Sequence, residues 1–126
     1  MVKTRTITMT VNRKTGDVFD AILNSPPKMM PDASQNEDGS WSFSTPRGNA
    51  SLKFMQNKTL GILDHLYIDD EASWNVPMKV IPSGEDSEVT ITLQKPEILT
   101  DEQFDERMKE IGILFAELKK IIENTN

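Results

Sequence analysis

The chain has 126 residues, 37% hydrophobic and 27% charged, which is enough for one domain whose core needs no disulfide or metal. The net charge of −6 argues against nucleic-acid-binding and polybasic membrane-surface proteins, because both need clustered basic side chains. Cysteine is absent and histidine occurs once, which excludes disulfides, thiol nucleophiles, iron–sulfur clusters and zinc sites built from cysteines or a histidine pair. We therefore expect a single domain over 1–126, with no cofactor.

The N-terminal third predicts a strand, a helix and a short helical turn. Residues 3–11 alternate threonines with Ile7, Met9 and Val11, which is typical of a strand with one buried face. Thr15 is expected to cap a helix over the apolar positions that follow, and prolines at 26 and 27 end it. Residues 28–33 are expected to add one helical turn. This N-terminus lacks the apolar run of a signal peptide, and no segment reaches the length of a membrane span, so we expect a cytoplasmic protein without membrane insertion.

The middle of the chain predicts an antiparallel meander. Period-two alternation occurs in five segments separated by short polar turns, namely 41–43, 50–54, 60–68, 73–81 and 88–95. Pro77 falls inside one of them, so its missing N–H must lie at solvent, at an edge or at a bulge.

The C-terminal segment predicts a long helix. Thr100 and Gln103 form a capping-box pattern, and acidic residues follow in the first turn. One apolar stripe then extends over about 22 residues, roughly 33 Å of helix. Its members are Phe104, Met108, Ile111, Phe115, Leu118 and Ile122. The apolar stripe of a helix of this length needs a broad surface to pack against, and we expect the sheet to provide it.

Three segments carry a family resemblance. GILDH at 61–65, WNVPMKVIP at 74–82 and TDEQF at 100–104 resemble the small polyketide cyclase/dehydrase-type relatives of the SRPBCC, START and birch-pollen-allergen superfamily. The resemblance implies an α+β helix-grip fold, in which a curved antiparallel sheet of five to seven strands wraps a long C-terminal helix in the order β-α-α-β meander-α. It also implies that the space between sheet and helix holds a hydrophobic ligand. The superfamily includes carriers, receptors, cyclases and co-chaperone domains, so the resemblance assigns no catalytic residue.

The strand at 60–68 leaves two orientations open. One face carries Leu60, Ile62, Leu66 and Ile68 together with Asp64, whereas the other carries Gly61, Leu63, His65 and Tyr67. The number of apolar residues favours the first face as the inner one. Burial cost favours the second, because an unpaired carboxylate inside is more expensive than a neutral imidazole. We adopt the second, with Gly61 letting the C-terminal helix approach. An apolar strip from 60 to 68 then lies outside and suggests a homodimer.

The candidate ligand site combines the expected inner wall with the helix stripe. Gly112 lies within the helix at a cost of about 1 kcal/mol relative to Ala, which indicates either close contact with the sheet or room for a ligand. The tryptophans are either cavity lining or core. The predicted cavity residues are Phe54, Leu63, His65, Tyr67, Trp74, Phe104, Met108, Ile111, Gly112 and Phe115.

Three functions remain open. The leading hypothesis is binding of a hydrophobic or amphipathic small molecule between sheet and helix. A cyclase- or hydratase-type enzyme with His65 as acid or base is the first alternative. A non-enzymatic interaction module with a filled interior, like the co-chaperone relatives, is the second. The acidic clusters at 36–38 and 69–71 are interpreted as solvated turns, because neither has the spacing of a calcium loop.

Overall fold

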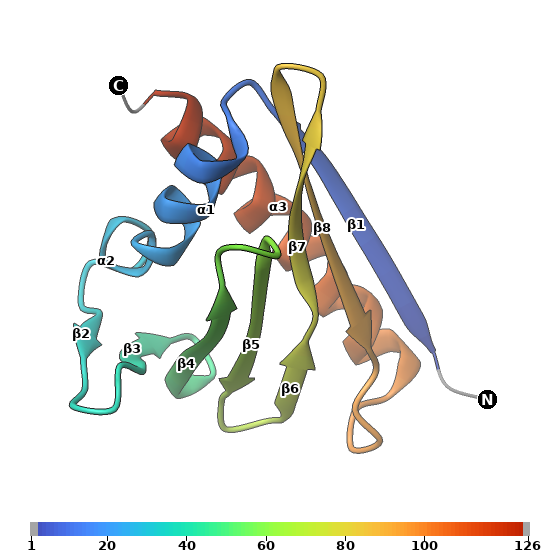
Figure 1. Cartoon of the computed structure of the whole chain (residues 1–126). Coiled ribbons are helices and arrows are strands. Elements are labelled where there is room, and N and C mark those ends of the chain that lie inside the picture. The colour runs from blue at the N-terminus through green and yellow to red at the C-terminus, as the bar shows by residue number, and fades with distance from the viewer. Residues whose placement is uncertain (1–2, 125–126) are drawn as a thin grey trace.

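The computed structural model describes residues 3–124, and within them the alternating segments form one antiparallel sheet with helices on one face (Figure 1). The elements are β1 (Thr4–Val11), α1 (Thr15–Leu23), α2 (Pro26–Met29), β2 (Ser34–Gln35), β3 (Trp41–Thr45), β4 (Gly48–Asn57), β5 (Ile62–Ile68), β6 (Ser73–Val76), β7 (Met78–Ser83), β8 (Asp86–Gln94) and α3 (Asp101–Glu123). This is the predicted order and the predicted α+β helix-grip architecture.

The sheet has eight strands where the sequence predicted five to seven. Its order is β1-β8-β7-β5-β4-β3-β2, and β6 pairs with β5 beside this path. The additional strands are the two-residue β2 and the division of the expected 73–81 strand into β6 and β7. That division falls at Pro77, after which β7 pairs with β8 while keeping a pairing with β5 through Lys79, and the carbonyl of Pro77 accepts the N–H of Thr92 at 3.1 Å. A residue without an N–H is tolerated at such a break in a strand.

Two local predictions near the N-terminus need correction. Thr15 is the first residue of α1, whose N-cap is Lys14 without a side-chain hydrogen bond. The helical turn expected at 28–33 lies earlier, at Pro26–Met29. The reason is that proline is favoured in the first helical turn, where its fixed φ suits the helix and no N–H is needed.

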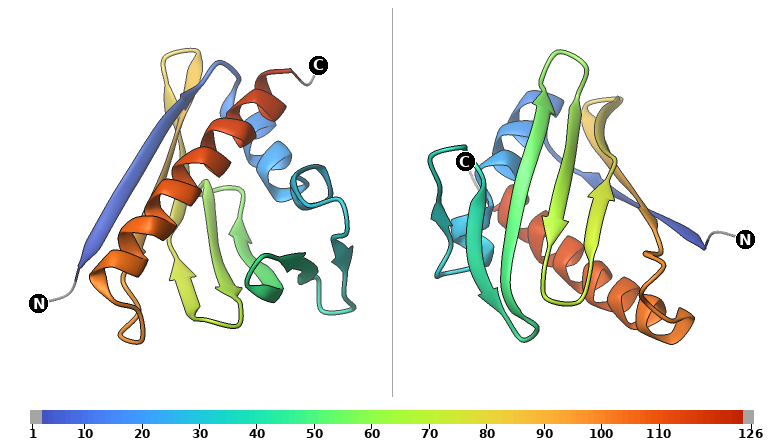
Figure 2. Two further views of the ribbon diagram at one scale, coloured as in Figure 1. Left: turned by 180° about the vertical axis from the view of Figure 1, so that it is seen from behind. Right: turned by 90° about the horizontal axis from the view of Figure 1, so that it is seen from below.

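Helix α3 lies diagonally across the concave face of the sheet, and α1 and α2 close one end (Figure 2). Its predicted capping box is present, because Thr100 and Gln103 exchange side-chain and backbone hydrogen bonds. The helix is tied to both ends of β1. Lys3 Nζ is 2.8 Å from a carboxylate oxygen of Asp105, and the N–H of Asn12 donates to Glu123 at 2.9 Å.

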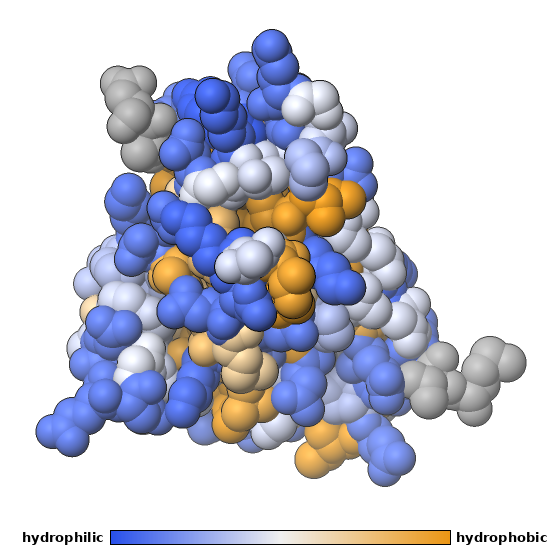
Figure 3. Space-filling view, viewed as in Figure 1, coloured by the Kyte–Doolittle hydropathy of each residue, from blue (hydrophilic) through white to orange (hydrophobic). Residues whose placement is uncertain are grey.

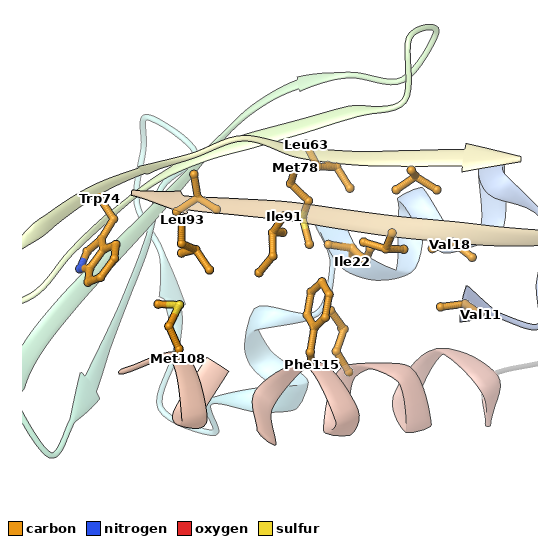
Figure 4. Packing of buried hydrophobic residues seen from close by; sticks show 14 of the residues in the cluster. Val11, Val18, Ile22, Leu63, Trp74, Met78, Ile91, Leu93, Met108 and Phe115 are labelled. Atoms are coloured by element: carbon orange, nitrogen blue, oxygen red, sulfur yellow. The ribbon is translucent and has the colours of Figure 1, made fainter. Parts of the chain in front are cut away.

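The core lies between α3, α1 and the β1–β8–β7 side of the sheet (Figure 4). Register explains its composition, because Ile91 pairs with both Ile7 and Met78 and all three point to the same face. The most enclosed members, with almost no exposed surface, are Val11, Val18, Leu63, Val89 and Phe104.

Candidate functional site

Strand β5 places His65 and Tyr67 on the inner face of the sheet. Leu63 on the same face is wholly buried, whereas Ile68 on the opposite face is 39% exposed. Asp64 points outward, and its carboxylate accepts the backbone N–H of Met78 at 2.9 Å. The burial-cost argument therefore gave the orientation that the structure shows.

Gly61 was expected to let the C-terminal helix approach the sheet, but the element that approaches it is another strand. A Cβ atom there would lie 2.3 Å from the carbonyl oxygen of Val80 on β7, not against the C-terminal helix, and φ is +68°. Glycine is required because the backbone is left-handed and the next strand approaches too closely for a side chain.

The predicted cavity residues separate into an enclosed group and an accessible group. Five of them have almost no exposed surface and pack within the core, namely Leu63, Trp74, Phe104, Met108 and Phe115. Figure 4 shows Leu63, Trp74, Met108 and Phe115 among the core side chains. Trp74 and Phe104 stack with ring centroids 6.1 Å apart. Core packing therefore accounts for these residues in this conformation.

The accessible group lies on β4, β5 and α3. Phe54, His65, Tyr67 and Ile111 are half-buried, and all but His65 belong to the shell packed around the core. Trp41 and Leu52 are also half-buried, and their register pairs place them on the same inner face. We call these six residues the aromatic wall. Leu52 was absent from the predicted site, although its even-numbered spacing from Phe54 signalled the shared face.

Gly112 does not belong to this wall. The residue is exposed, and a Cβ atom built on it would meet nothing within 4 Å. The expected contact with the sheet is therefore wrong, whereas room for a ligand at Gly112 stays a prediction. The buried stripe of α3 passes one side of Gly112, which faces away from the core.

His65 is neutral in this setting and offers an acceptor. Its Nδ1 lies 3.0 Å from the carbonyl oxygen of Leu63, and since a carbonyl only accepts, Nδ1 carries the proton. Burial lowers the pKa of His65 below 6.5, against the opposing effects of that hydrogen bond and Asp64. Nε2 is consequently a lone-pair acceptor beside Phe54, whose ring lies edge-on with centroids 5.4 Å apart. No carboxylate of the described residues hydrogen-bonds this imidazole.

The turn at 69–71 is an anchored ion-pair cluster, which corrects the solvated-turn interpretation. The side chain of Asp69 is fully buried, and its carboxylate accepts hydrogen bonds from the N–H groups of Glu71 and Ala72 and from the Tyr67 hydroxyl. Arg107 on α3 pairs with it at 2.9 Å. Burial opposes ionisation, but these donors outweigh it and keep the pKa of Asp69 below its usual value. Burial, with the charge of Asp69, raises the pKa of Tyr67 to about 12.

Arg47 extends this cluster to the rim of the aromatic wall. It comes from the turn between β3 and β4, and its guanidinium binds both carboxylate oxygens of Glu110 on α3, one at 2.6 Å. The same side chain is 2.9 Å from Glu71. The open side of the sheet is thus fastened to α3 by charged groups, whereas the β1 side joins α3 by apolar packing together with polar contacts at the two ends of β1.

Two surface hollows lie away from the space between sheet and α3. One, of about 510 Å³, lies over the β3–β4 hairpin and is lined by serines and by Asp32 and Asp70. The other, of about 230 Å³, lies between the start of α1, the β4–β5 turn and β7. Neither is lined by a residue of α3.

The outer face of β5 and its neighbours carries apolar side chains among polar ones, seen as scattered orange in Figure 3. The most exposed members are Met55, Leu60, Ile68 and Ile81. Within residues 3–124, no three Asp, Glu or His side chains gather as metal ligands, and none of the helices has the length and apolarity to cross a membrane.

No family model matches the sequence, and no curated protein matches it significantly. Solved structures match its fold over almost the whole chain. Ara h 8.0201 superposes with a TM-score of 0.72 at 12% identity, covering 99% of this chain and 100% of its own. Norcoclaurine synthase from Thalictrum flavum superposes at 0.67 with 14% identity, covering 100% and 90%. A START superfamily protein from Mycobacterium smegmatis superposes at 0.60 with 11% identity, covering 95% and 94%.

Proposed function

We propose, from the helix-grip fold shared with these structures, that the chain binds a small apolar or amphipathic molecule against the aromatic wall. The observation that carries this proposal is the partial exposure of Trp41, Phe54 and His65 on the concave side of the sheet. Apolar and aromatic surface that a fold leaves uncovered on a concave face is the usual lining of a ligand site. The ligand contacts accessible rings and does not need to enter the packed core.

The polar groups on the wall narrow the ligand chemistry. Tyr67 donates its hydroxyl proton to Asp69, so that hydroxyl is already engaged. His65 Nε2 is an acceptor, which a phenol, alcohol or amine of the ligand would complement. One structural neighbour, norcoclaurine synthase, was solved in complex with dopamine and hydroxybenzaldehyde. Both are small aromatic molecules with hydrogen-bond donors, which supports the same class of ligand here.

Binding can be tested with anilinonaphthalene sulfonate followed by a panel of hydroxylated aromatic compounds. Phe54→Ala should weaken binding of the probe by at least about tenfold, since it removes the ring beside His65. Ile68→Ala is the matched control, because Ile68 is an exposed apolar residue of the outer face. Equal affinities of the wild type and Phe54→Ala, or a loss confined to Ile68→Ala, would refute the proposal.

The two alternatives from the sequence remain predictions. The enzyme alternative needs a partner for His65, and within residues 3–124 its one hydrogen bond is to the carbonyl of Leu63. The interaction-module alternative is favoured by the enclosed core around Phe104 and Leu63. Native mass spectrometry after mild purification separates it from ligand binding, because an interaction module would retain no small molecule on the aromatic wall.

A further inference from the structure

Strand β1 is a free edge of the sheet. It ends the strand order, has β8 as its one strand neighbour among the described residues, and has no element beyond it in either view (Figures 1 and 2). Natural edge strands are usually protected by proline, bulges or several charges. The eight residues of β1 contain Arg5 as their one charge and no proline, and six of them are β-branched. Such an edge is a template for another strand.

The free backbone groups of this edge belong to the threonines. Lys95 donates its N–H to the carbonyl of Lys3, so the odd residues of β1 direct their backbone groups toward β8. The even residues, Thr4 to Thr10, therefore direct theirs off the edge. The register agrees, because Thr6 and Thr8 lie opposite Thr92 and Thr90 with hydroxyls 3.4 Å apart, as expected for the closer, non-hydrogen-bonded pairs.

We propose that β1 pairs antiparallel with β1 of a second copy of this chain, joining two sheets about a two-fold axis at Ile7. In that register Thr6 faces Thr8 of the second copy and Thr4 faces Thr10, and their outward N–H and C=O groups satisfy one another. The outer face becomes a continuous ladder of threonines, a favourable cross-strand pairing. The inner face brings Ile7 against its own copy, as an isologous interface requires.

The residues of helix α3 that lie beside β1 independently support the same two-fold axis. Asp105, Gly112, Ala116 and Glu123 lie on one stripe of the helix, being seven, four and seven residues apart. Asp105 contacts Lys3 just before β1 and Glu123 contacts Asn12 just after it, so this stripe runs alongside β1 with Gly112 near its middle. Gly112 and Ala116 are exposed. The glycine that the core does not explain thus lies beside the proposed axis, where a second α3 needs room.

The charges on this stripe are complementary under the same symmetry. Asp105 and Lys119 each lie seven residues from Gly112, so a two-fold axis there brings each toward the other residue of the second copy. Lys119 forms no ion pair with any described residue. By contrast, the outer strip over 60–68 is interrupted by Asp64 and flanked by Lys53 and Lys79, which offer no comparable self-matching pattern. The β1 edge is therefore the better-supported interface.

The test is sedimentation velocity over a concentration series, with Thr8→Pro as the main variant. Its N–H points away from β8, so proline removes an interface donor and leaves the internal ladder intact. We expect the wild type to reach twice the 14.3 kDa chain mass and Thr8→Pro to raise the dissociation constant by at least about tenfold. Thr8→Val keeps the N–H and should remain dimeric. A monomeric wild type, or an unaltered dimer in Thr8→Pro, overturns the proposal.

Two further measurements do not require that the protein folds with a proline at position 8. Amide hydrogen exchange should show the N–H groups of Thr6 and Thr8 protected at high concentration and exposed on dilution, with Ile7 protected throughout. Gly112→Glu should weaken the dimer, because it places two like charges at the two-fold axis. The substitution fits within a single chain, since a Cβ atom at Gly112 meets nothing within 4 Å. Concentration-independent exchange overturns the proposal, and so does a dimer that Ile68→Lys dissociates but Gly112→Glu leaves intact.

Discussion

The two sides of the sheet show the same alternation in sequence but differ in how they are covered. On β7 and β8 every inward residue of the pairs Val80–Val89 and Met78–Ile91 is buried under α3 and α1. On β3 to β5 three of the inward residues, Trp41, Leu52 and Phe54, keep accessible surface. Inward direction is therefore a property of strand register, whereas burial depends on what lies above the strand. The uncovered side is where we place ligand binding.

The largest expected effect is on the covered side. Phe104→Ala should lower the free energy of unfolding by about 3–5 kcal/mol, because Phe104 is wholly buried and stacks on Trp74. Phe54→Ala on the uncovered side should cost clearly less, about 1–2 kcal/mol, since the ring is already partly solvated. Urea denaturation of both variants measures the difference. Equal losses would mean that the two sides are equally packed.

The ion-pair cluster predicts a large effect at one arginine and a small one at another. Arg107→Ala leaves the buried Asp69 carboxylate without its cation and should cost about 3 kcal/mol. Arg47→Ala removes more exposed pairs and should cost about 1 kcal/mol or less. Urea denaturation midpoints of the two variants measure these losses. If Arg47→Ala were the more destabilising, the ion pairs of Arg47 with Glu71 and Glu110 would contribute more to stability than the buried pair of Arg107 with Asp69.

The pH dependence tests the environment of His65. Because burial holds the folded-state pKa below the unfolded value of 6.5, the unfolded chain binds a proton first as pH falls. Stability contributed by neutral His65 is complete above that value and declines as pH drops toward the lower folded-state pKa. Thermal melts between neutral and mildly acidic pH should show this decline in the wild type and less of it in His65→Gln. An identical decline in both would place the titration elsewhere.

The smallest effect concerns Gly112. Under conditions where the chain is monomeric, Gly112→Ala should stabilise it by about 0.5–1 kcal/mol, since the added methyl meets nothing and alanine favours helix. Gly61→Ala is the contrasting variant and should be strongly destabilising, because its Cβ collides with the Val80 carbonyl. Thermal unfolding of dilute samples measures both. Destabilisation by Gly112→Ala would indicate an unseen contact at that position.

Most of the fold was predictable because its signals are local. Alternation gave the strands, Thr100 and Gln103 gave the start of α3, and the prolines at 26 and 27 gave the end of α1. The site was predictable in part. His65 and Tyr67 were assigned inward from the cost of burying Asp64, a comparison that sequence permits. The contact of Gly112 with the sheet, by contrast, was wrongly predicted. The spacing of apolar residues along a helix does not show which side of the apolar stripe packs against another element.

The sequence by itself determined the element order, the faces of the strands and the absence of cysteine chemistry, since these follow from residue type and period. Only the tertiary structure decided that Asp69 is a buried anchor for Arg107, that Trp74 belongs to the core and that Phe54 does not. The physical reason is that burial and ion pairing join segments far apart in the chain. Their free energies depend on the angle at which α3 crosses the sheet, which no local pattern encodes.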